Sequence, residues 1–533
     1  MARLNTRTTQ PAKASGSPMR TVSTPDTVTH EGAPAFRYED RTALFVLGAG
    51  RFYNEDSFYE SGHEGARRFV ELVHKVAPND PEWFKGFVRW LRHDGNIRTA
   101  AIVAAAEGAK AWQRAGIRGT ADLVSAAIVR ADEPGEFVAY YREHVKRVLG
   151  GGVRRALKAC IRDLYTQRNV IKWDSAAKGY RFADVIDLVS AEPVNSAQAT
   201  LFKYLLDNRH HNDGSLDGLF MLQMYKQFQE RLRNDREGFL EMAISDPGML
   251  RQAGMTWENL SSSGPMNAKA WEVIIPSMGY MALLRNLRNF DEANVSQRMK
   301  EFVAKKLTDP DEVARSRQLP YRFMSAYENA QGAIWQSALD QALSLSAGNI
   351  PALDGKTVVM VDTSGSMQNR LSDKSKMPYV TAAALFGVAL AAKQEQAELL
   401  GFADGRRIFH HRVVRDAAVL RTTSDFVRRI GEDGHGTNIA AAVRFAQSRN
   451  AARIVIISDM QCMHGAINWR GDGGYVVPPD VKVPVYAFNM AGYGQTVIDS
   501  ASTRHQLGGL SDSTFSLIKA IEVGQRGQWP WMK

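Results

Sequence analysis

Hydrophobic and polar positions follow two different patterns along this chain of 533 residues. Between about residues 42 and 348, apolar residues recur every three to four positions, which predicts amphipathic helices. Loops that contain Gly, Pro or Asn separate these segments, and no fixed repeat length is visible. We therefore expect an irregular α-solenoid of packed helix hairpins. The predicted helices span 62–76, 81–92, 99–115, 119–131, 136–148, 154–167, 182–190, 197–206 and 216–234.

The pattern changes after residue 348, where short apolar runs alternate with helical segments. Strands that alternate with helices indicate βαβ units and a doubly wound parallel sheet. Gly348, Pro351 and Gly355 mark the linker before this region. The predicted strands span 356–362, 397–403, 453–458 and 481–489, and the predicted helices span 379–394, 424–430, 438–448 and 511–523.

The N-terminal segment is rich in Thr, Ser, Pro and Ala, so it has too little apolar surface to fold and is expected to be a disordered tail. A contact of its scattered basic side chains with a phosphate backbone is the alternative to a solvated tail. The predicted fold class is a multidomain α plus α/β protein. We divide it into a disordered tail (1–38), an α-helical domain (39–348) and an α/β domain (349–533).

A candidate metal site lies at the end of the first predicted strand, in the sequence KTVVMVDTSGSM. Further oxygen-bearing side chains stand on a loop that opens a helix and directly after the strand 453–458. Because the carboxyl ends of parallel strands meet at one edge of a sheet, we expect these side chains to converge. Carboxylate and hydroxyl oxygens suit a hard divalent cation, Mg²⁺ first and Ca²⁺ second, with waters completing the shell. The alternative is an ordinary strand-to-helix turn. The candidate ligands are Asp362, Ser364, Ser366, Thr437 and Asp459.

The same site lacks the groups that catalysis needs. No neighbouring residue in the sequence is a candidate nucleophile or general base, and we interpret His435 as structural or solvated. A Gly-rich phosphate loop with a Lys is absent from the sequence. We therefore expect binding rather than an enzyme.

Charge adds a second candidate function. The net charge of +10 and the pI near 9.4 favour a polyanionic partner. The densest basic stretch is the predicted helix 154–167 and the following IKWDSAAKGYRF, in which aromatic and basic residues alternate. Such a mixture suits phosphate contact with base stacking, and the alternative is a solvated basic face over an aromatic core. The candidate RNA-binding residues here are Arg154, Arg155, Lys158, Arg162, Lys172, Lys178 and Arg181.

The compartment is expected to be the cytoplasm. The two cysteines, Cys160 and Cys462, form neither a disulfide framework nor a CxxC zinc motif. No run approaches the roughly 18 apolar residues of a membrane span, and the N-terminus has no apolar signal region. We expect no contact with a membrane.

Two resemblances sharpen these predictions. DTSGS at 362–366, followed by Thr437 and Asp459, resembles the metal-ion-dependent adhesion site of von Willebrand factor A domains. The phrases FVLGAGRFY at 45–53, AGMTWENL at 253–260, WEVIIPSMGYMALLRNLRNF at 271–290 and LPYRFMSAY at 319–327 resemble the TROVE module of the Ro autoantigen family. In that family the module precedes a von Willebrand factor A domain, and the resemblance covers roughly residues 40–530.

The resemblance implies a monomeric ring of HEAT-like helix hairpins that the A domain closes. It also implies that Y RNAs bind the outer surface and that single-stranded ends of misfolded RNA enter the hole. Arg285 and Arg288 would then be available to the channel. Bacterial members resemble adaptors that tether RNA to an exoribonuclease, polynucleotide phosphorylase. Ser190 stands where the family often has a histidine, and Asp187 where a basic residue is common, so contact with Y RNA at this edge is expected to differ.

The leading functional hypothesis is therefore an RNA-binding adaptor in RNA quality control or degradation, part of a ribonucleoprotein. The alternative is a protein-interaction scaffold whose metal site captures an acidic loop, with RNA binding incidental. Salt dependence separates the two, because phosphate contacts weaken steeply with added salt.

Overall fold

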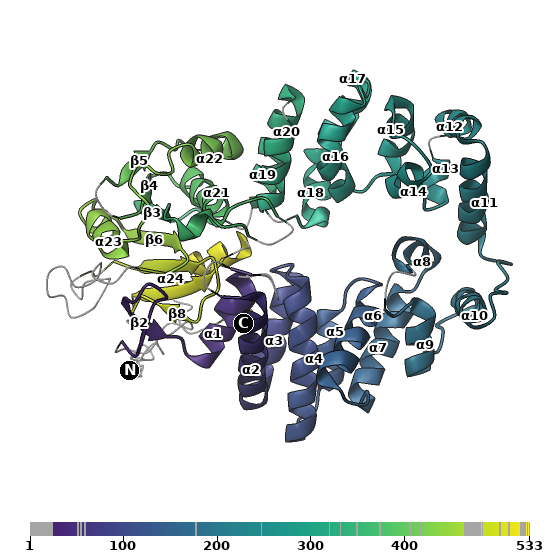
Figure 1. Cartoon of the computed structure of the whole chain (residues 1–533), viewed down its shortest axis with the longest axis horizontal. Coiled ribbons are helices and arrows are strands. Elements are labelled where there is room, and N and C mark those ends of the chain that lie inside the picture. Colours follow the sequence, from purple (N-terminus) through teal and green to yellow (C-terminus); the bar gives the residue numbers. More distant parts are fainter. Residues whose placement is uncertain are drawn as a thin grey trace, which may run out of the picture. The chain divides into compact units, whose positions relative to one another are not determined.

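The computed structural model folds into two compact units, which we call the sheet unit and the helical unit (Figure 1). The sheet unit takes in residues 1–65, 349–417 and 424–533, and the helical unit takes in 66–348 and 418–423. The structure describes residues 25–50, 53, 56–57, 60–175, 179–246, 248–318, 320–330, 332–347, 350–371, 375–404, 407–415, 418–462, 481, 483–499, 503–509, 512–522, 529 and 531.

The helical unit consists of consecutive short helices joined by short loops. Within the described ranges, no helix of the chain is long and apolar enough to cross a membrane. The elements are α2 (Gly62–Asn79, which begins just before the unit), α3 (Pro81–His93), α4 (Arg98–Ala115), α5 (Thr120–Ala127), α6 (Glu133–Tyr140), the π-helical turn η1 (Tyr141–Val145), α7 (Gly151–Leu164), α8 (Gln167–Trp173), α9 (Phe182–Val189), α10 (Ser196–His210), α11 (Phe220–Asn234), α12 (Arg236–Ser245), α13 (Met249–Gln252), α14 (Trp257–Ser262), α15 (Ala268–Ile274), the 3₁₀ turn η2 (Ile275–Ser277), α16 (Tyr280–Glu292), α17 (Gln297–Leu307), α18 (Pro310–Ser316), α19 (Pro320–Asn329) and α20 (Ala333–Ser346).

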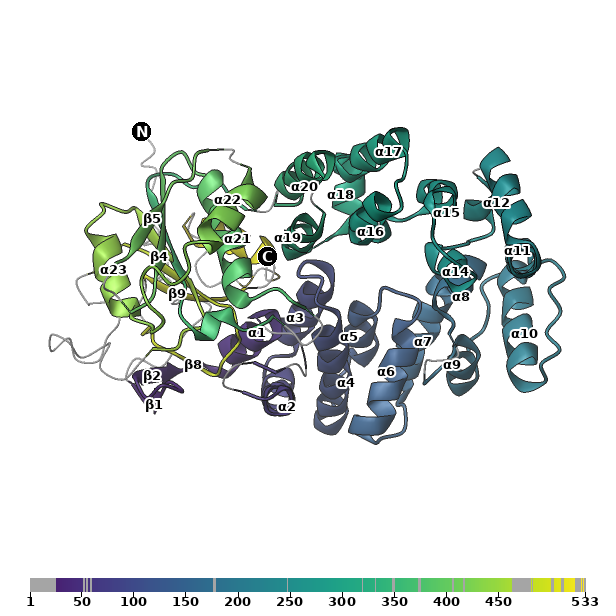
Figure 2. The same cartoon turned by 45° about the horizontal axis from the view of Figure 1, so that its top comes forward.

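Helices α3, α4 and α5 pack side by side (Figure 2). The Asp80 side chain accepts a hydrogen bond of 3.3 Å from the Trp83 amide, and Pro81 then begins α3, where its missing N–H is harmless. On α4, Gly108 lies so close to the Phe84 ring that a Cβ atom there would overlap it. The missing side chain at Gly108 therefore permits the close packing of α3 and α4.

The sheet unit is built on a six-stranded sheet with the order β5-β4-β3-β6-β7-β9, parallel except for β5. Its strands are β3 (Thr357–Asp362), β4 (Ala397–Phe402), β5 (Phe409–His411), β6 (Arg453–Ser458), β7 (Val485–Asn489) and β9 (Arg504–Gly508). Its helices are α1 (Asp40–Gly50), η4 (Ser366–Gln368), α21 (Tyr379–Ala392), α22 (Val419–Val427, whose residues up to 423 group with the helical unit), α23 (Ile439–Gln447), η5 (Asp512–Phe515) and α24 (Ser516–Glu522).

Alternate residues of the central strand β3 face helices on opposite sides of the sheet. Met360 belongs to a buried cluster with Val443 of α23. On the other face, a Cβ atom on Gly387 of α21 would come within 2.8 Å of Val361. Since neighbouring strand residues point to opposite faces, both faces of the sheet are covered. The predicted helical region followed by a doubly wound, mostly parallel sheet is confirmed, whereas the closed ring stays a prediction.

The N-terminal segment corrects two predictions. Strands β1 (Thr27–Val28) and β2 (Pro34–Arg37) form a hairpin, and β2 pairs with β8 (Gln495–Thr496), beside which it lies in Figure 1. Phe36 is fully buried, and α1 packs against β9. The predicted disordered tail is therefore wrong for residues 25–38, and residues 1–24 lie outside the described part. Residues 39–65 group with the sheet unit rather than with the helical domain predicted to begin at 39.

Candidate nucleic-acid interface and metal centre

Two adjacent strands bring the candidate metal ligands of the sheet unit together. Strand β3 ends at Asp362 and its parallel neighbour β6 ends one residue before Asp459. The side chains of both aspartates are buried. The Ser364 amide donates a hydrogen bond of 2.9 Å to Oδ1 of Asp362, and the Ser366 hydroxyl donates to Asp459. The hydroxyl oxygens of Ser364 and Ser366 lie 3.3 Å apart, so four of the five predicted ligands form one buried cluster.

The fifth candidate, Thr437, lies on a loop held against this cluster. The Gly365 amide donates a hydrogen bond of 2.8 Å to the His435 carbonyl, which joins the two loops. The Asn438 amide donates to the Ala403 carbonyl at 2.7 Å, at the end of strand β4. Thr437 itself is buried, and α23 begins two residues later. The structure thus places the Thr437 loop at the same edge of the sheet as the DTSGS loop.

The electrostatics of this cluster fit a cation. Burial raises the pKa of Asp362, and burial together with the charge of Asp362 raises the pKa of Asp459. In the described part of the chain, neither carboxylate has a Lys or Arg partner within salt-bridge distance. No cluster of three or more His, Cys, Asp or Glu side chains capable of holding a metal occurs among the described residues. A metal here would rely on two carboxylates plus hydroxyls, the donor types that Mg²⁺ accepts.

The described basic residues predicted to contact RNA occupy four different environments in the helical unit. Helix α7 buries its apolar face and turns its charged face outward, with Arg155 and Arg162 exposed. That face carries the predicted group Arg154, Arg155, Lys158 and Arg162.

Arg181 has a structural role. Its guanidinium lies 2.7 Å from Oδ2 of the buried Asp174, whose other oxygen accepts a hydrogen bond from the Phe182 amide. Lys178 lies outside the described residues. Arg285 and Arg288 are exposed on α16, and Arg288 forms an ion pair of 3.3 Å with Glu292. The structure therefore does not gather all the predicted RNA-binding residues into one patch.

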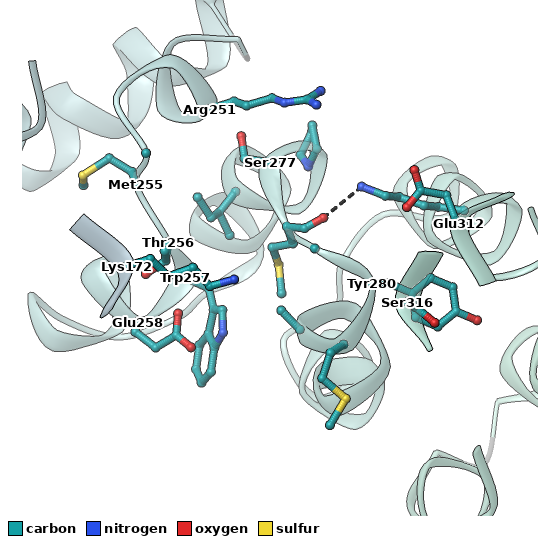
Figure 3. Close-up of a pocket in the computed structure, with 18 of the residues that line it drawn as sticks. Lys172, Arg251, Met255, Thr256, Trp257, Glu258, Ser277, Tyr280, Glu312 and Ser316 are labelled. Carbon is teal, nitrogen blue, oxygen red and sulfur yellow. Dashed lines mark hydrogen bonds between the residues drawn. The ribbon is translucent and has the colours of Figure 1, made fainter. Parts of the chain in front are cut away.

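Lys172 points to a feature that the sequence did not reveal, a pocket of about 560 Å³ in the helical unit (Figure 3). Helices α8, α13, α14, α16, α17 and α18 supply its walls. Its cationic lining residues are Arg168, Lys172, Arg251, Lys306 and Arg315, and its acidic ones are Glu258 and Glu312. Residues of the segments AGMTWENL and WEVIIPSMGYM line the pocket. These two segments were the feature of the sequence from which the pocket could have been predicted.

Two lysines of this pocket have lowered pKa values, chiefly because they are partly buried. Loss of hydration and then the charge of Arg130 lower the pKa of Lys172. Burial lowers the pKa of Lys306, and the charges of Arg251 and Arg315 lower it further against the opposing effect of Glu312. The ammonium of Lys306 donates a hydrogen bond of 2.9 Å to the Met278 carbonyl, drawn as a dashed line in Figure 3. An anion in the pocket would favour the charged forms of both lysines.

Aromatic rings accompany these cations. The Arg130 guanidinium lies 4.2 Å from the centre of the Trp173 ring, and the Lys172 ammonium lies 4.8 Å from it. Trp257, half-buried in the pocket wall, stacks on Trp271 with ring centres 5.9 Å apart. A fixed indole beside several cations can offer a stacking surface to a base whose phosphates meet the charges.

Two family models match the chain. The TROVE domain model matches residues 224–383, and the von Willebrand factor type A domain model matches residues 357–461. The first match contains most of the pocket, and the second contains the strands that carry Asp362 and Asp459.

Two curated proteins are similar to parts of this chain. Telomerase protein component 1 of Mus musculus is 37% identical over 76 residues, which are 14% of this chain and 3% of that protein. RNA-binding protein RO60 of Caenorhabditis elegans is 25% identical over 197 residues, which are 33% of this chain and 30% of that protein. The chain thus spans less than a third of the length of these curated relatives.

A solved structure resembles the chain over a longer stretch. The Deinococcus radiodurans RO (RSR) protein matches with a TM-score of 0.60 at 15% identity, over 91% of this chain and 100% of that one. At this identity the likeness shows the fold. The chain therefore contains segments that match the TROVE domain and the von Willebrand factor type A domain, and its fold is similar to that of the Deinococcus radiodurans RO (RSR) protein.

Proposed function

We propose that this protein binds RNA and that the cationic pocket of the helical unit holds part of it. The observation that carries the proposal is the crowding of Lys172, Arg251 and Lys306 around one pocket with the Trp257 ring in its wall. Phosphates neutralise such charges, and an aromatic face accepts any base. The outward charged face of α7 extends the basic surface available to a longer polyanion.

The class of RNA follows from the shape of the site. A pocket with one stacking ring suits an unpaired nucleotide rather than the regular backbone of a duplex. We therefore propose that it takes single-stranded ends of structured or misfolded RNA, and that small noncoding RNAs of the Y type bind elsewhere on the helical unit. The name of the relative RO60 supports an RNA ligand. We further propose that the protein acts in the cytoplasm as an adaptor for an exoribonuclease such as polynucleotide phosphorylase, without a reaction of its own.

Fluorescence anisotropy with a labelled RNA hairpin tests the pocket. A hairpin with a single-stranded 3′ tail should bind more tightly than its blunt counterpart, and its affinity should fall steeply with salt. The substitutions Arg251→Gln and Lys306→Gln should each weaken binding of the tailed RNA by roughly tenfold, since each removes a charge-assisted phosphate contact. Lys305→Gln is the matched control, because Lys305 is exposed on the same helix and outside the pocket. Salt-insensitive binding, or equal effects at 305 and 306, would contradict the proposal.

We also propose that the sheet unit holds one divalent cation, Mg²⁺ first, through Asp362, Ser364, Ser366, Thr437 and Asp459. The support is the pair of buried, mutually repelling carboxylates among hydroxyl donors. When bound, the cation would neutralise that pair and hold the loops after β3 and β6. Isothermal titration of the metal-depleted protein with Mg²⁺ tests this. Asp362→Ala should abolish the binding and leave RNA affinity unchanged, because the RNA contacts proposed above all lie in the helical unit.

A further inference from the structure

Two walls of the pocket, helix α8 and the C-terminal end of α18, are each held by a residue that does not line the pocket. Lys172 of α8 and Ser316 of α18 lie on different sides of the pocket in Figure 3. Asn96, in the loop between α3 and α4, contacts the end of α18. Arg130, in the loop between α5 and α6, contacts α8.

Asn96 holds the turn that follows α18. Its side-chain amide donates a hydrogen bond of 2.8 Å to the carbonyl of Arg317, although the two residues are 221 positions apart in the sequence. Arg317 stands between Ser316 and Gln318, which both line the pocket. Asn96 and Arg317 have φ angles of 51° and 52°. Such a left-handed backbone is uncommon for an arginine and persists where neighbouring contacts hold it. The hydrogen bond therefore joins two loops of defined shape.

Arg130 holds the end of α8. Its guanidinium donates two hydrogen bonds of 2.7 Å, one to each carboxylate oxygen of the buried Asp132. The same guanidinium lies 4.2 Å from the centre of the Trp173 ring at the end of α8. Lys172 precedes Trp173 directly, and its ammonium lies 4.8 Å from the centre of that ring. Because the bidentate pair with Asp132 fixes the guanidinium plane, Arg130 also fixes the ring beside Lys172.

Both holding residues are anchored on one buried carboxylate, that of Glu133. This side chain is fully buried, and its Oε1 accepts a hydrogen bond of 2.6 Å from Arg92. Arg92 also donates to Oδ1 of Asn96 at 3.4 Å. The other oxygen of Glu133 accepts a hydrogen bond of 2.9 Å from the Arg130 backbone amide. Buried networks of this kind are rigid when their members are paired. The positions of the two walls thus depend on one common group.

We propose that Asn96 and Arg130 are positioning residues of the pocket, which hold α18 and α8 at the separation that a nucleotide requires. This rests on the RNA proposal above. Neither residue contacts the phosphates, since the Asn96 amide is bonded to Arg317 and the Arg130 guanidinium to Asp132. Loss of either contact loosens one wall and leaves the charges of Lys172 and Arg315 in place. Binding must then order that wall, which lowers the affinity without removing a charge contact.

Salt-dependent anisotropy with the tailed and blunt hairpins tests this role. Asn96→Gly removes the side chain and keeps the left-handed backbone accessible, and Arg130→Lys keeps the charge and loses the bidentate, planar contact. Each should weaken binding of the tailed hairpin roughly threefold to tenfold and leave the blunt hairpin unchanged. The slope of log affinity against log salt should also stay unchanged, whereas Lys306→Gln should reduce it by about one. The matched controls are Asn212→Gly, at an exposed asparagine with a φ of 58°, and the exposed Arg118→Lys.

Hydrogen exchange of the RNA-free protein gives a second readout. Asn96→Gly should speed amide exchange in the segment 310–318, and Arg130→Lys in the segment 167–173, while the two controls change neither. Wild-type affinity for the tailed hairpin in both variants would overturn the inference and leave the RNA proposal standing. A loss of affinity with a reduced salt slope would also overturn it, because the residues would then contact phosphate directly. If the wild type does not prefer the tailed hairpin, the RNA proposal fails and this inference fails with it.

Discussion

The Ser458 hydroxyl donates a hydrogen bond of 2.6 Å to Oδ2 of Asp362, across the pair formed by strands β6 and β3. Ser458 was not among the residues predicted from the sequence, where it appears only as the end of an apolar run. With the Ser364 amide on Oδ1, it occupies the second oxygen of a carboxylate that has no cationic partner in the described part of the chain. Ser458 therefore sets the orientation in which Asp362 would meet a metal.

Replacing Ser458 by Ala should destabilise the metal-depleted sheet unit. The buried Asp362 carboxylate would lose a hydrogen bond, at a cost of about 1–3 kcal/mol in the free energy of unfolding. Urea unfolding in EDTA measures this cost. Ser448→Ala is the control, since this exposed hydroxyl donates to the Phe445 carbonyl at the end of α23. A loss at 458 no larger than at 448 would show that the hydrogen bond contributes little.

Asp459→Asn should have opposite effects with and without metal. In EDTA the amide removes the repulsion between two buried carboxylates, so we expect the variant to be more stable than the wild type by about 1–3 kcal/mol. With Mg²⁺ at a hundred times its dissociation constant, the wild type should gain about 2.7 kcal/mol and the variant nothing. Unfolding curves in the two conditions give both values. Equal gains from Mg²⁺ would contradict the assignment of Asp459 as a ligand.

The parts of the fold that the sequence predicted are those whose signal is local. The central strands β3 and β6 are nearly continuous apolar runs, and the covering helix α23 has its own apolar period. Strand β9 was not predicted because it contains the polar residues Arg504, His505 and Gln506, which give no apolar run although all three are buried. The His505 ring stacks on Tyr486 with centres 5.0 Å apart, so a partner distant in sequence makes this burial favourable. The hairpin at residues 27–37 was missed for the same reason, since β8 is its partner.

The metal site and the pocket also differ in how local their sequence signals are. Most of the metal motif lies within five residues of one loop, and strand adjacency supplies Asp459, so the sequence predicted the cluster. The pocket draws its charges from several helices, and Arg251 and Lys306 carry no local signal of a shared role. Conversely, Arg181 looked like an RNA contact because it stands among aromatic residues, yet its partner Asp174 is visible only in the folded chain. The spacing of basic residues along a helix predicts that they share a face. It does not predict which acidic side chain pairs with each of them in the folded chain.

Arg181→Ala should therefore affect stability rather than RNA affinity. Among the described residues, its removal leaves the buried Asp174 carboxylate with the Phe182 amide as its remaining partner, and we expect the free energy of unfolding to fall by about 1–3 kcal/mol. RNA affinity of the folded variant should stay within twofold of the wild type. Arg155→Ala, on the exposed face of α7, should show the reverse: unchanged stability and weaker RNA binding. Urea unfolding and anisotropy together separate the two roles, and a tenfold loss of affinity at 181 would restore it as an RNA contact.

The pH dependence of RNA binding should reveal the crowded lysines of the pocket. Burial and the neighbouring Arg251 and Arg315 lower the pKa of Lys306, whereas a bound phosphate favours its charged form. Affinity should therefore be full where Lys306 is protonated and decline as pH rises, beginning below the ordinary lysine value of about 10.5. Anisotropy with oligoadenylate, whose bases do not titrate there, measures the decline between about pH 7 and 9.5. Lys306→Arg keeps its charge throughout and should flatten the profile, while Lys305→Arg should leave it unchanged. Parallel profiles for the two variants would show that Lys306 does not contact the RNA.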